Sequence, residues 1–191
     1  MTVLNKKAFE AMREEYEKAD QRREGLIQKS REVVKLSKQL IYAVQRHDTK
    51  EAERLVRELN GKKKTLGDEK EASGLDYTGA LRVALQEYVE ALAFFEFVRK
   101  NDVPSARELG VSTENYLLGL CDLTGELVRL AINYAIKGET GKIIPIKDFV
   151  SELYYEMMQF DFRNSELRKK FDGMKYDLKK LEELVLGLRL K

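Results

Sequence analysis

The chain has 191 residues, of which 43% are hydrophobic and 36% charged, so it can bury a core and is not a disordered polyelectrolyte. Its 35 Lys and Arg residues nearly balance 33 Asp and Glu residues, and the formal net charge of +2 excludes a uniformly basic, histone-like nucleic-acid binder but not local basic patches. Cys121 and His47 are each the only residue of their type, which excludes an internal disulfide, a thiolate zinc site and histidine-based catalysis. Because no uncharged run approaches the roughly 18 residues of a membrane span and no signal peptide is evident, we expect a soluble, cytoplasmic protein.

The first predicted helix covers 4–47 and is unusually long, which is typical of extended bundle helices that contact other subunits. Its heptad-like apolar row consists of Phe9, Met12, Tyr16, Ala19, Leu26, Val33, Leu40 and Val44.

Basic side chains form a second row on this helix. Arg31, Lys35 and Lys38 follow one another at i, i+4 and i+7 and therefore share a face, with Gln28, Tyr42, Gln45 and Arg46 on or near it. We call Arg31, Lys35 and Lys38 the basic row. Such a row can follow a phosphate backbone, so we predict RNA binding at Arg31, Lys35, Lys38 and Arg46. The alternative is a solvated helix face without a ligand.

A shorter helix at 49–60 is predicted to end in a polar loop at 61–74, where Gly61 and Gly67 flank a Lys triplet. We favour the basic row over this triplet as the RNA-binding site, because a flexible Lys cluster serves solubility as often as binding. The next predicted helix, 76–100, is apolar almost all the way round and is therefore expected to be buried. Glu87 and Glu90 are the exceptions, and they lie about 60° apart on one face. We assign the aromatic residues of this helix to the core rather than to base stacking.

The helix predicted at 112–137 confines its polar residues to one narrow stripe with spacings of four and three. The stripe consists of Asn115, Gly119, Asp122, Glu126, Arg129 and Asn133. Gly119 lies one turn before Asp122 and leaves room there for a ligand or another backbone. The last predicted helices cover 146–160 and 165–189. Together these patterns predict an all-α fold, a single helical domain over 1–191 with six to seven helices.

If the polar faces of 76–100 and 112–137 meet, four carboxylates converge, which we call the carboxylate cluster: Glu87, Glu90, Asp122 and Glu126. Oxygen ligands of this kind suit Mg²⁺ or Mn²⁺, and two such ions can promote phosphodiester hydrolysis without a histidine. Two alternatives remain at this point. Paired acids at helical spacing are common on solvated faces, and Arg129 could simply neutralise Glu126 one turn away.

Three segments resemble the translin family, which contains translin and translin-associated factor X (TRAX). They are QEYVEALAFFEF (86–97), YLLGLCDLTGELVRLAIN (116–133) and FDFRNSELRKKFDGMKYDLKKLEELV (160–185). The first two are similar to TRAX and the third to translin, a mixture that fits a prokaryotic, archaeal-type, TRAX-like homologue.

The resemblance implies a helical bundle that assembles into a hollow octamer, with Mg²⁺-dependent RNA endonuclease sites facing its interior. The acidic site of TRAX corresponds to Glu87, Glu90, Asp122 and Glu126, which would be both the metal ligands and the catalytic residues. The long insert that TRAX carries between these two helices is missing here, which favours a homo-oligomer.

The leading hypothesis is thus a metal-dependent endoribonuclease acting on single-stranded or short duplex RNA. The alternative is a non-catalytic, translin-like oligomer that binds single-stranded RNA or DNA. A di-iron bundle is disfavoured because no histidine lies on the inner helices, and a purely structural role would leave four acids with few cations.

Overall fold

The computed structural model describes residues 4–73 and 79–189, and in this part of the chain the fold is all-α, as the sequence predicted. The helices are α1 (Lys6–Gln45), α2 (Thr49–Ser73), α3 (Gly79–Lys100), α4 (Ala106–Leu109), α5 (Thr113–Ile136), α6 (Ile143–Met157) and α7 (Glu166–Arg189), with a short 3-10 turn, η1 (Thr140–Lys142), before α6. None of the helices described is long and apolar enough to cross a membrane.

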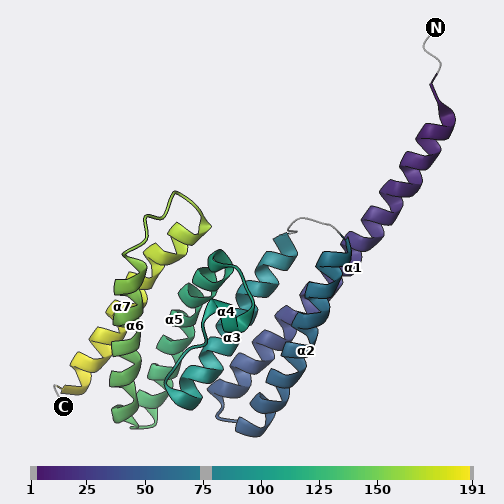
Figure 1. Ribbon diagram of the computed structural model, residues 1–191. Helices are drawn as coiled ribbons and strands as arrows, with labels where there is room; N and C mark the ends of the chain where they lie inside the picture. Colours follow the sequence, from purple (N-terminus) through teal and green to yellow (C-terminus); the bar gives the residue numbers. More distant parts are fainter. Residues whose placement is uncertain (1–3, 74–78, 190–191) are drawn as a thin grey trace.

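The helices lie side by side in one row (Figure 1). Helix α1 packs between α2 and α3, α3 packs on α5, and α5 packs on α7, which in turn contacts α6. Fully buried Phe94 on α3, Leu40 on α1 and Leu127 on α5 belong to one continuous apolar core. A smaller cluster, which includes Leu118 and Phe171, joins α5 to α7. The polar faces of α3 and α5 are thereby held against each other.

The N-terminal part of α1 extends beyond the row of helices (Figure 1). Its apolar residues Phe9, Met12 and Tyr16 are exposed, whereas Leu26 and Val33 further along the same predicted row are buried. We call residues 6–24 the α1 arm. The first half of the apolar row is thus exposed to solvent, whereas its second half is buried against α2 and α3.

The polar loop predicted at 61–74 was wrong over its described residues, because α2 continues through this segment to Ser73; residue 74 lies outside the described residues. Leu59 and Leu66 are fully buried and keep the helix against its neighbours. A Cβ at Gly61 or Gly67 would meet nothing within 4 Å, so neither glycine serves a turn or a close contact. Burial of the apolar face outweighs the helix-weakening effect of about 1 kcal/mol per glycine.

The predicted boundaries of two other elements also change. Helix α6 begins at Ile143 and ends at Met157 instead of covering 146–160, and it accommodates Pro145 in its first turn, where no amide hydrogen is required. The one-turn helix α4 was missed, although Ser105 and Glu108 form a capping box that its sequence spacing indicates. Helix α3 is described from Gly79, so 76–78 of its predicted start lie outside the described residues.

Candidate active site

Gly119 sets how closely α3 and α5 approach. A Cβ at this position would lie 2.6 Å from the Val89 Cβ and 2.8 Å from the carbonyl oxygen of Gln86, so only glycine fits without moving α3. Of the two roles considered for this glycine, the structure shows contact with another helix. This contact is one turn before Asp122 and places the polar stripe of α5 opposite Glu87 and Glu90.

The structure brings the four acids of the carboxylate cluster together. Burial, and after it the charges of Asp122, Glu87 and Glu126 in that order, together raise the pKa of Glu90 to about 8, and Lys170 opposes this increase. Burial also raises the pKa of Glu87. The charge of Lys38 opposes this increase, and the charge of Asp122 adds to it. Electrostatic repulsion between the acids therefore extends across the interface between α3 and α5.

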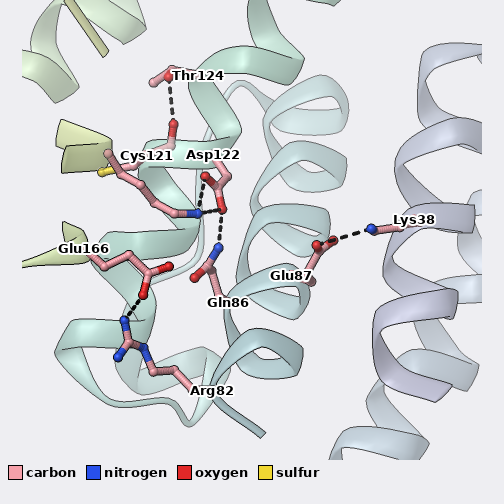
Figure 2. Close-up of polar contacts among 9 residues, drawn as sticks. Lys38, Arg82, Gln86, Glu87, Cys121, Asp122, Thr124 and Glu166 are labelled. Atoms are coloured by element: carbon pink, nitrogen blue, oxygen red, sulfur yellow. Dashed lines mark hydrogen bonds and ion pairs between the residues drawn. The ribbon is translucent and has the colours of Figure 1, made fainter. Parts of the chain in front are cut away.

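Three of the four acids each have a cation nearby. The Lys170 Nζ lies 2.6 Å from Asp122 Oδ2, the Lys38 Nζ lies 3.6 Å from Glu87 Oε1, and an Arg129 nitrogen lies 3.6 Å from Glu126 Oε2. Figure 2 shows Glu87 of α3 directed toward Lys38 of α1, and Asp122 of α5 directed toward Gln86. The ion pair between Arg129 and Glu126 that the alternative required is thus present, but it involves only one of the four acids.

Glu90 differs from the other three acids. It is only 9% exposed, and it makes no hydrogen bond or ion pair with the residues the structure describes. A buried carboxylate without a partner is energetically costly, and the raised pKa means that the acid avoids the cost by staying protonated at neutral pH. A cation placed in the cluster would remove that cost.

The donor chemistry of the cluster fits a hard divalent cation, because it supplies four carboxylates and one of them is buried without a counter-ion. In their present rotamers, no three acids among residues 4–73 and 79–189 are grouped closely enough to coordinate one ion. The lysines and amides that hold Asp122, Glu87 and Glu126 account for this arrangement. For the acids to coordinate one ion together, their side chains would have to leave these rotamers.

Two glutamines orient acids of the cluster, and sequence analysis missed the role of both. Gln45 is buried, and its Nε2 donates to Glu126 Oε2 at 2.9 Å and to the Glu126 carbonyl oxygen at 3.0 Å, while Asn133 donates to its Oε1 at 3.2 Å. Gln45 therefore belongs to the acidic site and not to the RNA-binding face. Gln86 donates to Asp122 Oδ2. Its position one turn before Glu90 places it on the same face of α3, and this spacing could have indicated its role in the sequence.

The basic row is exposed along α1, as is Arg46, whose guanidinium lies 5.5 Å from the centre of the Tyr42 ring. Lys38 is 65% exposed and also reaches Glu87, so the C-terminal end of the basic row meets the carboxylate cluster. The aromatic residues of α3, including Tyr88 and Phe94, are buried in the core, as the sequence indicated.

A sequence profile of the translin family matches residues 21–191, and the chain therefore belongs to the translin family. A protein of Methanocaldococcus jannaschii is 32% identical over 157 residues, which cover 80% of this chain and 70% of that protein. Translin-associated protein X of Rattus norvegicus is 26% identical over 229 aligned residues, covering 96% of this chain and 78% of the rat protein. Translin of Gallus gallus is 37% identical over 91 residues, so that match spans 47% of this chain and only 40% of the chicken protein.

Solved structures share the fold over nearly the whole chain. The apo-NeC3PO structure has a TM-score of 0.89 at 33% identity and covers 98% of this chain and 99% of that one. The AfC3PO structure has a TM-score of 0.82 at 25% identity and covers 96% of this chain and 97% of that one. The fold and the family that the sequence resemblance implied are both confirmed.

Proposed function

We propose that this chain is a Mg²⁺- or Mn²⁺-dependent endoribonuclease that hydrolyses RNA phosphodiester bonds at the carboxylate cluster. The observation that carries the proposal is Glu90, a largely buried acid with no ion-pair partner in the described part of the chain. Together with Glu87 on the same helix, it faces Asp122 and Glu126 of α5 across the contact between α3 and α5. Two further points support RNA hydrolysis. The chain belongs to a family whose relatives include translin-associated protein X, and it carries all four acids of the acidic site that the resemblance to TRAX implied.

Each residue of the cluster has a role that follows from its position. Glu87, Glu90, Asp122 and Glu126 would hold the cation, which would stabilise the charge developing on the phosphodiester and make water a better nucleophile. Gln45 keeps the Glu126 carboxylate oriented through one hydrogen bond, and a second hydrogen bond anchors Gln45 to the Glu126 carbonyl oxygen. The packed helices hold the amide groups of Gln45 and Gln86, so Glu126 and Asp122 are oriented before substrate binds.

The RNA backbone would follow the exposed basic row and Arg46 on α1. Lys38 belongs both to this row and to the surroundings of Glu87, so RNA bound along α1 places a phosphate next to the carboxylate cluster. AfC3PO, a chain of the same fold, has been determined in complex with duplex RNA. We further propose a cytoplasmic homo-octamer that takes single-stranded or short duplex RNA as substrate.

A second candidate function is a non-catalytic oligomer that binds RNA or single-stranded DNA. It is favoured by one observation, namely that Lys38 and Lys170 already neutralise two of the acids. In that case the cluster would stabilise the interface between α3 and α5 rather than hold a metal.

The test is an RNA cleavage assay on the purified chain with Mg²⁺, Mn²⁺ or EDTA, beside a Glu87→Gln/Asp122→Asn variant. We expect cleavage with either metal, none in EDTA, and a loss on the order of a hundredfold or more in the variant. A Glu152→Gln/Glu156→Gln variant is the matched control, because these two acids are exposed on α6 and removing them also neutralises two charges. Intact RNA binding without cleavage would favour the non-catalytic oligomer instead.

A further inference from the structure

Lys170 of α7 lies at the carboxylate cluster, although sequence analysis gave it no role. Its Nζ is 2.7 Å from Asp122 Oδ1 and 2.6 Å from Oδ2, and both side chains are about three-quarters buried, with 25% and 27% exposure. Lysine at the edge of a bundle usually extends into solvent, so an ammonium group held by both oxygens of an inward-facing carboxylate is a specific arrangement.

Helix α7 is fixed to α3 and α5 on either side of this lysine. Arg82 of α3 forms an ion pair with Glu166, one turn before Lys170 (Figure 2). Further along, Asp177 accepts a hydrogen bond of 2.9 Å from Thr124, a fully buried residue of α5. The position of Lys170 beside Asp122 is therefore set by the packing of α7 and does not depend on a single flexible side chain.

Asp122 has little capacity left for a further ligand. A carboxylate offers about four acceptor positions. Lys170 uses one on each oxygen, and Gln86 donates to Oδ2 as well. A divalent cation at Asp122 would also stand beside the ammonium group, and like charges at such short range repel strongly in a partly buried site. The cation and the Lys170 ammonium therefore exclude each other at Asp122.

We propose that Lys170 is the resident counter-ion of Asp122 and competes with the divalent cation for it, so that α7 sets the metal affinity of the site. This inference rests on the proposed function, because it needs the cluster to bind a metal. It makes Lys170 a positioning residue: it holds Asp122 oriented while no metal is bound, and it withdraws when a metal binds.

The experiment measures binding of Mn²⁺ alone, without RNA, by electron paramagnetic resonance on the full chain. Lys170→Met keeps the length of the side chain and removes the charge, and we expect it to bind Mn²⁺ more tightly by on the order of tenfold. Lys170→Arg keeps the charge and can hold both oxygens of Asp122, so its affinity should not exceed that of the original chain. Lys169→Met is the matched control, because Lys169 is the exposed neighbour on the same helix.

A second measurement, the melting temperature, shows whether the Lys170→Met variant is folded. The melting temperature of Lys170→Met should rise more on adding Mn²⁺ than that of the original chain, because tighter binding to the folded state stabilises it more.

The outcomes separate the two proposals. Equal or weaker Mn²⁺ binding by Lys170→Met, with the original chain still binding, would overturn the role of Lys170 and leave the metal-dependent function intact. Absence of Mn²⁺ binding in every variant would overturn both. Binding by Lys170→Met alone would support the competition and would show that the lysine closes the site.

Discussion

Glu90 is an acid whose ionisation differs between the folded and the unfolded chain. In the folded state its pKa is about 8, raised above the ordinary value of 4.5 first by burial and then by neighbouring acids. Between these two values the folded state keeps a proton that the unfolded state has released. The metal-free protein should therefore lose stability as the pH rises through this interval, and the slope should vanish above it.

Melting temperatures recorded in EDTA between about pH 5 and pH 8.5 test this expectation. The Glu90→Gln variant cannot ionise, so its melting temperature should vary less with pH than that of the original chain. Parallel curves for the two proteins would mean that Glu90 is already ionised, and that a nearby group supplies its counter-charge.

At the scale of elements, the contact between α3 and α5 determines whether the carboxylate cluster exists. Gly119→Ala would place a Cβ 2.6 Å from that of Val89, so the helices must separate. We expect a loss of about 1–3 kcal/mol in the free energy of unfolding, measured by denaturant titration, together with weaker RNA cleavage.

Gly125→Ala on the same helix is the matched control for that substitution. The Cβ it adds would have no neighbour nearer than Asp177 Oδ2 at 4.0 Å, and Gly125 is exposed. This variant should be neutral or more stable by up to about 1 kcal/mol, because alanine favours the helix. Equal losses for the two variants would show that helix propensity, and not the close approach, governs the effect.

The face of α1 that carries the basic row gives a second prediction at this scale. Replacing Arg31, Lys35 and Lys38 by Ala should weaken RNA binding and lower the slope of log K against log salt by about 2 if all three contact phosphates. Filter binding across a salt series measures both quantities. The Arg31→Ala/Lys35→Ala variant separates phosphate contact from the effect of Lys38 on Glu87, since it leaves that ion pair in place.

A Lys62→Ala/Lys63→Ala/Lys64→Ala variant removes the same charge from α2. There Lys62 pairs with Glu32, and Lys63 donates to the Gly110 carbonyl oxygen at 2.9 Å. A similar loss of salt dependence in this variant would show that general positive charge, and not the row on α1, binds the RNA.

At the scale of the whole molecule, the α1 arm is the part that a single chain does not bury. Phe9 is 48% exposed, Met12 58% and Tyr16 75%, and all three lie on one side of the helix. Phe9→Ser/Tyr16→Ser should reduce the mass of the assembly measured by light scattering, without lowering the helical signal in circular dichroism. Glu14→Ser, on the opposite side of the arm, is the control and should leave the mass unchanged.

An unchanged mass in the Phe9→Ser/Tyr16→Ser variant would mean that the arm does not take part in assembly. The proposed octamer would then have to be built from surfaces of the helical row itself.

The sequence by itself determined the helical class, the faces of single helices and the four acids, because the period of an α-helix fixes which residues share a face whatever lies opposite. It also carried the translin resemblance in three segments. The glycines and lysines of the polar segment 61–73 misled the prediction there, because burial of Leu59 and Leu66 is a property of the packed molecule.

Only the tertiary structure decided which groups meet the acids. Gln45, Lys38 and Lys170 come from α1 and α7, far from α3 and α5 along the chain. Their positions depend on how closely the helices pack, which Gly119 permits, and no local spacing encodes that distance. The protonation of Glu90 follows for the same reason, since burial and the charges of three neighbouring acids arise only when the helices have come together.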